Sequence, residues 1–596
     1  MTFDPTKIKP MHIAVALVGL MALLLLFAAL DEMERHHWDR NYETIFAAYR
    51  IWMIIGAAGF GFALGWFMSP RAAGLRAILG AIATIILVWV AAMNNGPVGW
   101  GLATLLAVTG FLMALGYWMG RAVRALGETP TTFGSAEWAG ADELRARDVF
   151  GTSGFRLGEF FNGEVFETIS YGGDRHMMTV APTRKHKGTA QIIPELLTHE
   201  GSTMVIDPKG ENAMITAAAR IEMGQEVHVV DPWHIAAIEG ITSARFNPLD
   251  WLQVGDVDIT ENAMLLADAI IIMSDGEKFW DEEAKALLVG VILYVATSDH
   301  EAGHRHLPRV RDLLLLDGED LTKLFQMMMA SPLHIVASAG ARCLQKDDKL
   351  LSNVMATVQS HTHFLDSARI RESMSASDFQ FEDLKSTAMS IYLVLPADRL
   401  NAFSRWLRLM VQQAITVNAR NIEEKPDRPV LFVLDELPAL GRLSMVEQAY
   451  GLMAGFGMQL HGIVQDLSQV KSVYGEGWET FIGNSGVVQY FGSRDRFTAE
   501  YFSALCGETT VWNLSSALAR SFGSSSGPNG MTSSESTSET DTRAASQRKL
   551  AYPDELMRMH DDKQLLIIDN LNPIIARKKR WFEDEALKDK GVNLHG

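Results

Sequence analysis

The sequence predicts an α/β fold with a doubly wound sheet for most of the chain after residue 132. Short apolar runs that end in charged turns alternate there with helical patterns, which is typical of a parallel sheet covered by helices. The first 120 residues are much more apolar, and from about 259 to 384 helical periodicity replaces the strand pattern. Because 596 residues exceed what one hydrophobic core usually organises, we expect several domains.

Four apolar stretches occupy the N-terminal region, at 13–30, 51–68, 77–93 and 98–119. Each is near the length of a transmembrane helix. Lys and Arg residues lie before the first stretch, between the second and third, and after the fourth, which places those segments on the cytoplasmic side. We therefore predict a transmembrane domain of four spans over 1–125, in which the last two stretches are either two spans or a re-entrant hairpin.

Five apolar runs have the character of buried strands. They lie at 171–180, 202–209, 226–232, 429–437 and 462–465. The second and third end in Asp-Pro, where proline stops strand pairing and the aspartate can begin a turn. In a parallel sheet, ligands bind at the carboxyl ends of such strands, so the loops that follow them are the candidate sites.

The loop after the first run resembles a nucleotide-binding P-loop, whose pattern is G-x-x-x-x-G-K-[ST]. Lys187 stands at the lysine position, where its ammonium can reach the β and γ phosphates of ATP. Ala181 and His186 stand where the pattern has glycine, and a positive φ at His186 would cost about 1 kcal/mol. A solvated basic turn is the alternative, but a helix N-terminus after a strand favours phosphate. The predicted phosphate loop is Ala181, Pro182, Thr183, Arg184, Lys185, His186, Lys187, Gly188 and Thr189.

Two carboxylates, Asp435 and Glu436, end the fourth apolar run. We predict that Asp435, with Thr189, holds Mg²⁺ and that Glu436 orients or deprotonates the attacking water. Gln465, at the end of the fifth run, is predicted to sense the γ-phosphate. The alternatives are an acidic strand end and a plain surface glutamine. The sequence therefore predicts ATP and Mg²⁺ as cofactors and Lys187, Asp435, Glu436 and Gln465 as catalytic residues.

The remaining boundaries follow from composition. Helical patterns at 262–273, 279–296, 321–330 and 349–362 predict an all-helical insertion over 259–384, which divides the nucleotide-binding domain into 132–258 and 385–596. Residues 521–546 are rich in Ser, Gly and Thr with almost no apolar content, so we predict a mobile loop there.

The cysteine content indicates the cellular compartment of the soluble part, and the net charge limits how the protein can bind nucleic acid. The 2 cysteines, Cys343 and Cys506, have no metal-ligand or disulfide-framework spacing, which is typical of a reducing cytoplasm. A formal net charge of −18 disfavours indiscriminate binding to nucleic acid, so contacts with DNA are expected only at local basic surfaces or in a channel.

Several segments in order resemble the type IV secretion coupling proteins of bacterial conjugation, which belong to the P-loop (RecA-like) class. They include Val205-Ile-Asp-Pro-Lys-Gly-Glu211 and Leu434-Asp-Glu-Leu-Pro-Ala-Leu-Gly441, and the others lie at 134–139, 191–197, 246–249, 391–396 and 551–556. The resemblance covers nearly the whole soluble part, and the family's anchor, nucleotide domain and helical insertion match the three zones described above.

The four predicted spans make the chain a multi-pass protein, although many members of the family have fewer spans, and we expect it in the bacterial inner membrane with cytoplasmic soluble domains. The resemblance implies a ring, a homo-hexamer, that binds ATP between subunits. The helical domain would receive single-stranded DNA with its relaxase, or an effector protein, and the ring would dock on inner-membrane proteins of the secretion channel. An arginine acting in trans on the phosphates is expected, and Arg399, Arg442 and Arg494 are the candidates.

Three functions remain open at this point. The first is an ATP-driven pump for these substrates. The second is a catalytically weak receptor that recruits substrates to the same channel. The third is a chromosome-segregation DNA translocase, which we expect to carry a winged-helix domain after the motor, a feature for which the sequence after Asp435 has little room.

Overall fold

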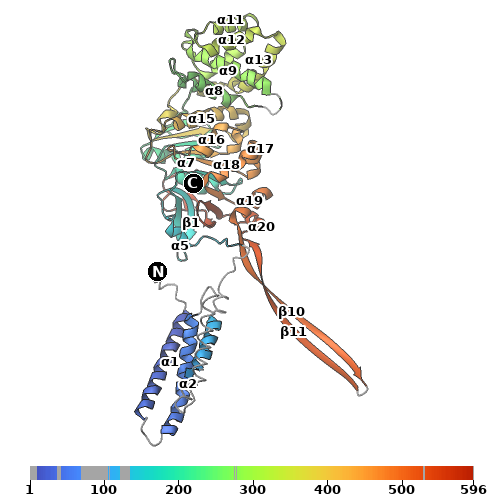
Figure 1. Ribbon diagram of the computed structural model, residues 1–596. Coiled ribbons are helices and arrows are strands. Elements are labelled where there is room, and N and C mark those ends of the chain that lie inside the picture. Colours follow the sequence, from blue (N-terminus) through green and yellow to red (C-terminus); the bar gives the residue numbers. More distant parts are fainter. Residues whose placement is uncertain are drawn as a thin grey trace. The chain divides into compact units, whose positions relative to one another are not determined.

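The computed structural model describes residues 10–36, 42–68, 105–106, 108–120, 134–273, 276, 278–527 and 530–594. The chain divides into two compact units (Figure 1). One comprises Met1–Phe133 and Thr510–Ser546, and the other comprises Gly134–Thr509 and Gln547–Gly596.

The smaller unit contains apolar helices that pack through glycine. α1 spans Pro10–Arg35, α2 spans Tyr42–Met68, and Val108–Gly120 is also helical. A Cβ added to Gly65 of α2 would lie 1.9 Å from the carbonyl oxygen of Met113. The absent side chain therefore lets the two helices meet at backbone distance, as small residues do between membrane helices.

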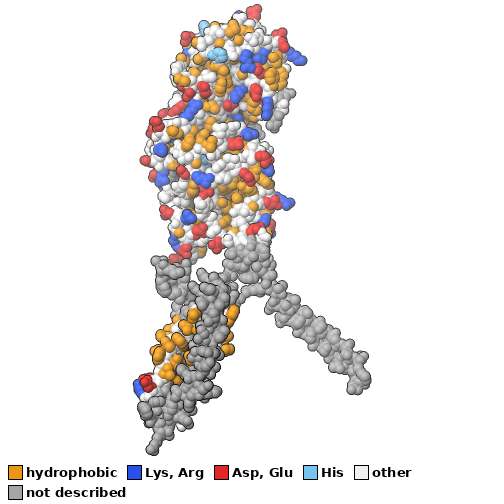
Figure 2. Space-filling model, in the orientation of Figure 1, with side chains coloured by type: hydrophobic (Ala, Val, Ile, Leu, Met, Phe, Trp, Pro, Cys, Tyr) orange, Lys and Arg blue, Asp and Glu red, His pale blue; other side chains and the backbone are white. Residues whose placement is uncertain are grey.

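Among the described residues, one helix is long and apolar enough to cross a membrane, over Ala14–Glu32, with a mean hydropathy of 2.5. Large apolar side chains of this helix are exposed, and Figure 2 shows them as a hydrophobic surface. Ile51–Trp66 and Val108–Gly120 are shorter apolar helices that fall in the second and fourth predicted spans. The third, at 77–93, lies outside the described residues, so the number of four spans stays a prediction.

In the predicted mobile loop at 521–546, the described residues 521–527 and 530–546 belong to two long paired strands, and the mobility stays a prediction. β10 spans Glu508–Gly527 and β11 spans Gly530–Lys549, and they make a separate two-stranded sheet. The composition excluded an apolar core, but paired strands satisfy each other's backbone N–H and C=O groups without one.

The larger unit is built on one mixed sheet, whose order in the described chain is β2-β1-β13-β12-β9-β3-β8-β7-β4-β6-β5. The pairings from β9 to β5 are parallel, and those from β2 to β9 are antiparallel. The strands are β1 Phe155–Phe161, β2 Phe166–Tyr171, β3 His176–Val180, β4 Thr203–Asp207, β5 Glu226–Val230, β6 Met389–Val394, β7 Val430–Asp435, β8 Met458–Val464, β9 Ser485–Tyr490, β12 Lys563–Ile568 and β13 Ile574–Arg577.

Both faces of the parallel strands are buried. Along β7, Val430, Phe432 and Leu434 belong to one hydrophobic cluster, whereas Leu431 and Val433 belong to another. Successive side chains of a strand point to opposite faces, so the two clusters are the two cores of a sheet covered on both sides. This burial explains why the strand runs are apolar without alternation, and it confirms the predicted doubly wound α/β fold.

Helices before, between and after the strands cover the sheet (Figure 1). They are α5 Ala141–Ala146, α6 Ile193–Leu196, α7 Glu211–Glu222, α15 Leu400–Arg420, α16 Ser444–Leu452, α17 Leu467–Tyr474, α18 Glu479–Gly483, α19 Arg496–Cys506 and α20 Pro553–Met557.

The segment between β5 and β6 is helical wherever it has regular structure in the described residues. Its helices are α8 Ile259–Ile270, α9 Lys278–Thr297, α10 Leu307–Leu314, α11 Gly318–Met329, α12 His334–Gln345, α13 Asp348–Thr362 and α14 Ala368–Ser373. The four predicted helical segments coincide with α8, α9, α11 and α13. These helices belong to the same compact unit as the sheet, so a separate insertion domain with bounds 259–384 stays a prediction.

A buried arginine fixes the helix that follows the phosphate loop. Arg220, near the end of α7, is fully buried and donates hydrogen bonds to the carbonyl oxygens of Leu196 at 3.2 Å and Gly201 at 2.6 Å. It also donates to Gln225 Oε1 at 2.6 Å. The guanidinium thereby satisfies carbonyl groups that the end of α6 leaves without intrahelical partners.

We expect Arg220→Met to lower the free energy of unfolding by about 3 kcal/mol, because buried carbonyl groups would lose their donors. The urea midpoint of tryptophan fluorescence measures the effect. The control Arg558→Met removes an exposed arginine paired with Asp554 and should change stability by less than about 0.5 kcal/mol. Equal midpoints for both variants and the parent would contradict this role of Arg220.

Candidate nucleotide site

The predicted site residues lie at one edge of the sheet. β8 pairs in parallel with both β3 and β7, with Val180 opposite Val464 and Asp435 opposite Ile463. The phosphate loop (residues 181–189), the two acids and Gln465 therefore all follow the carboxyl ends of adjacent strands. In the sequence these residues follow different predicted strands. The order of the strands in the sheet brings them together.

The phosphate loop leaves the sheet and runs directly into a helix. The Ala181 N–H donates to the Val464 carbonyl oxygen at 2.8 Å, so the first loop residue still pairs with β8. Lys187 precedes a π-helical turn, Gly188–Ile192, which continues into α6. Such turns are rare and often occur at functional sites, and the first N–H groups of a helix are free to bind an anion.

His186 takes the left-handed conformation that the glycine of the P-loop pattern would accept without strain. Its φ is 68°, and that of Arg184 is 65°. The positive φ that we predict for His186 in a loop with the usual P-loop conformation is therefore present. Burial lowers the pKa of His186, and the nearby Arg580 and Lys578 lower it further, so the imidazole is neutral near pH 7.

The ammonium of Lys187 joins both predicted carboxylates. Its Nζ donates to Asp435 Oδ1 at 2.7 Å and to Glu436 Oε1 at 2.6 Å. Burial alone would lower the pKa of Lys187, but the two carboxylates raise it, so the lysine is a cation. Burial raises the pKa of Asp435, whereas Lys187 acts in the opposite direction.

Gln465 contacts the second acid. Its Nε2 donates to Glu436 Oε2 at 3.1 Å, so the amide orients the carboxylate. Glu436 itself has a φ of 61°, a strained value that turns the chain directly after β7. The catalytic roles of Glu436 and Gln465, and the alternatives of a simple acidic strand end and a surface glutamine, stay predictions.

Thr189 carries a polar atom with no protein partner. Its Oγ1 is buried and makes no hydrogen bond. A buried hydroxyl left unpaired costs free energy, so an absent ligand is a reasonable cause. The hydroxyl and the Asp435 carboxylate are oxygen donors of the kind that Mg²⁺ takes alongside phosphate. Both predicted metal residues fit that ion, although the described residues contain no group of three or more His, Cys, Asp or Glu that could hold a metal alone.

A third carboxylate, the buried Asp207, ends the neighbouring strand β4. Burial raises its pKa to about 7, and Asp435 adds to the effect. Its Oδ2 accepts from the Ala213 N–H at 2.9 Å, and its Oδ1 accepts from the Lys209 N–H at 3.3 Å. These contacts make Asp207 the cap of the turn into α7.

The C-terminal segment supplies residues that sequence reasoning missed. Lys578 Nζ donates to the Lys185 carbonyl oxygen at 3.2 Å, Arg580 contacts His186 Nε2 at 3.4 Å, and Asp561 pairs with the Lys185 side chain. In the sequence, Lys578 and Arg580 belong to a run of four basic residues at 577–580, and that run is the one signal that could have indicated them. Charge runs of this kind usually form solvated surfaces, so the run alone did not point to the site.

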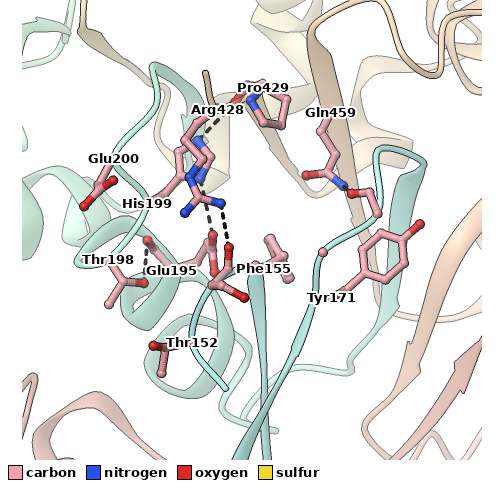
Figure 3. Close-up of a pocket in the computed structure, with 14 residues that line it drawn as sticks. Thr152, Phe155, Tyr171, Glu195, Thr198, His199, Glu200, Arg428, Pro429 and Gln459 are labelled. Carbon is pink, nitrogen blue, oxygen red and sulfur yellow. Dashed lines mark hydrogen bonds and ion pairs between the residues drawn. The ribbon is translucent and has the colours of Figure 1, made fainter. Parts of the chain in front are cut away.

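A polar cavity of about 140 Å³ lies at the opposite edge of the sheet, where β7 and β8 begin (Figure 3). His199 lies between the Pro429 carbonyl oxygen, 3.1 Å from its Nε2, and Glu195, 3.5 Å from its Nδ1. Arg428 donates to the Ser153 carbonyl oxygen at 2.5 Å. These polar groups have protein partners, and the cavity is separate from the phosphate loop.

The fold and its phosphate-loop edge define the P-loop, RecA-like class of nucleotide-binding fold. Residues 131–595 match the family model described as Type IV secretory system Conjugative DNA transfer. The chain belongs to this family.

Two curated relatives agree with that assignment. The chain is 28% identical to the conjugal transfer protein TraG of Escherichia coli over 418 residues, which cover 63% of this chain and 65% of TraG. It is 27% identical to the protein VirD4 of Agrobacterium fabrum over 478 residues, covering 76% of this chain and 66% of VirD4. The chain thus spans just under two thirds of these relatives.

Solved structures of the coupling protein TrwB share the fold. The complex of TrwB with ADPNP aligns with a TM-score of 0.56 and 13% identity, over 76% of this chain and 96% of TrwB. The complex of TrwB with ADP and Mg²⁺ aligns with the same score and coverage.

For the loop, we expect His186→Gly to tighten binding of a fluorescent ATP analogue by several-fold at most, because glycine removes strain of about 1 kcal/mol. Lys187→Ala should abolish binding in both backgrounds. Titrations at fixed salt measure both effects. Three indistinguishable isotherms would show that the loop does not hold phosphate.

For Thr189, we expect the isosteric Thr189→Val to weaken analogue binding in Mg²⁺ about tenfold and to leave binding in EDTA unchanged. The melting temperature should stay the same or rise, since valine removes an unpaired buried hydroxyl. An equal loss of affinity with and without Mg²⁺ would contradict a metal role.

Proposed function

We propose that the chain is a membrane-anchored ATPase that recruits DNA, or DNA with a relaxase or another protein, and delivers it to a type IV secretion channel. One observation carries the proposal. Lys187, Asp435, Glu436 and Gln465 meet at the phosphate-loop edge of a chain whose residues 131–595 match the conjugative DNA transfer family.

The ion pairs of Lys187 allow its ammonium to leave the two carboxylates and bind phosphate when a nucleotide enters the site. Its ammonium bridges Asp435 and Glu436 within 2.7 Å of each. Polyphosphate would take the ammonium from the acids, and the accompanying cation would give Asp435 a new positive partner. Charge stays balanced in the exchange, so neither buried group is left alone. The TrwB complexes with ADPNP and with ADP and Mg²⁺ support this pair of ligands.

Each residue then has a separate role. Lys187 binds the β and γ phosphates, and the loop N–H groups surround them. Asp435 and Thr189 would hold Mg²⁺, which supplies positive charge to the phosphates. Glu436 orients the attacking water and accepts its proton, while Gln465 holds the Glu436 carboxylate in place through the 3.1 Å hydrogen bond.

A ring of identical subunits would complete the site with an arginine from the neighbour. Arg399 lies 3.4 Å from Asp398, and Arg442 lies 3.7 Å from Glu447. Arg494 is exposed after β9 and takes part in none of the ion pairs recorded for the described residues. We therefore assign the trans role to Arg494 within the proposed homo-hexamer.

Membership of the family favours conjugative transfer over chromosome segregation. The apolar α1 supports a membrane anchor, and an inner-membrane location with cytoplasmic motor is part of the proposal. The receptor without turnover stays as the second candidate, because Ala181 and His186 replace the glycines of the P-loop pattern. ATP turnover separates the two.

We expect the full chain in detergent to release phosphate from ATP with DNA stimulation. Glu436→Gln should bind the ATP analogue and lose turnover by at least about 100-fold, because an amide cannot accept the proton of water. Asp435→Asn should instead weaken the binding that depends on Mg²⁺.

The control Glu476→Gln makes the same chemical change on an exposed glutamate and should match the parent. A parent that binds ATP without turnover would establish the receptor. Unchanged turnover in both acid variants would overturn the proposed mechanism.

A further inference from the structure

Lys578 is a buried cation with no carboxylate at ion-pair distance among the described residues. It follows β13 and is only 4% exposed. Its Nζ donates to the Lys185 carbonyl oxygen at 3.2 Å and lies 4.6 Å from the centre of the Phe491 ring. Among the ion pairs recorded for the described part of the chain, none includes Lys578.

The other members of the basic run are paired. Lys579 lies 2.6 Å from Glu159, Arg577 lies 3.9 Å from the same glutamate, and Arg580 lies 3.2 Å from Glu583. Burying an ammonium without a counter-charge costs several kcal/mol. Lys578 therefore makes the fold less stable than a neutral side chain of the same length would, and a function that needs its charge would explain it.

The Lys185 carbonyl lies on a strained part of the phosphate loop. The residues on either side, Arg184 and His186, both have positive φ. Alternation of left- and right-handed conformations turns successive N–H groups toward one concave side, where they bind anions. An ammonium that holds a carbonyl between two such residues fixes that arrangement.

We propose that Lys578 is a positioning residue of the nucleotide site, which fixes the phosphate loop through the Lys185 carbonyl and adds positive charge behind the bound polyphosphate. The proposal rests on the ATP binding proposed above. It also gives the C-terminal segment a part in nucleotide binding, since this segment holds the loop through Asp561 and Arg580 as well.

The buried position links nucleotide binding to a proton. The pKa of Lys578 is lowered to about 8, mainly by burial and also by the charges of Lys185 and Arg580, while Asp561 and Asp562 act in the opposite direction. The phosphate loop also carries His186, which is neutral in this range, Lys187, whose pKa the two carboxylates raise, and Lys185, which pairs with Asp561. Polyphosphate favours the charged ammonium of Lys578 and so raises its pKa. Affinity is therefore full below pH 8 and falls as pH rises through that value.

Titrating the fluorescent ATP analogue into the full chain in detergent, from pH 7 to 9.5, tests this inference. We expect Lys578→Met to weaken binding about tenfold at pH 7 and to remove the decline above pH 8. Its melting temperature should be unchanged or higher, because an unpaired buried charge is gone. Lys578→Arg should keep the affinity at pH 7 and hold it to pH 9.5, since arginine stays charged.

Lys588→Met is the matched control, because Lys588 is a lysine of the same segment that pairs at the surface with Glu585. It should match the parent throughout. Unchanged affinity in Lys578→Met overturns the inference while the proposed function stands. Weaker binding together with a lower melting temperature shows a structural lysine and also overturns it. A parent that binds no analogue removes the proposed function and this inference with it.

Discussion

The ion pairs that Lys187 makes with Asp435 and Glu436 are the contact on which the organisation of the larger unit depends. The lysine follows β3 and the acids follow β7, and these strands are separated only by β8. In this order the loop after β3 lies close enough to the end of β7 for the cation to reach both carboxylates. The parallel direction of β3, β8 and β7 also contributes, because it brings three carboxyl ends to one edge.

Much of this arrangement could be predicted from the sequence because the relevant signals are local. Strands buried on both faces leave apolar runs such as the one that ends at Asp435, and the candidate site residues lie at the ends of such runs or in the loops that follow them. The helical insertion was visible for the same reason, since its period differs from that of strands. The lysine position within the loop was predicted by spacing alone, and the structure places it beside both acids.

The features that the sequence did not predict depend on contacts between residues that are far apart in the chain. Lys578 lies 393 positions from Lys185, and nothing in the run at 577–580 distinguishes the buried lysine from its paired neighbours. The unpaired hydroxyl of Thr189 also depends on packing around it. The strands at 508–549 were missed because composition reports the lack of an apolar core and says nothing about strands that pair only with each other.

Several costly features of the larger unit lie at or beside the phosphate loop. Arg184, His186 and Glu436 are three of the six non-glycine residues with positive φ in the described chain, and Lys578 is a buried charge without an ion-pair partner there. Strain and unpaired charge persist where the surrounding structure enforces them, and in many proteins they serve to preorganise a site. Two contacts constrain the phosphate loop. Ala181, which follows β3, is hydrogen-bonded to β8, and Lys185 is hydrogen-bonded to the segment after β13. A polyphosphate would meet a loop already shaped and charged for it, so the binding energy is not spent on ordering the chain.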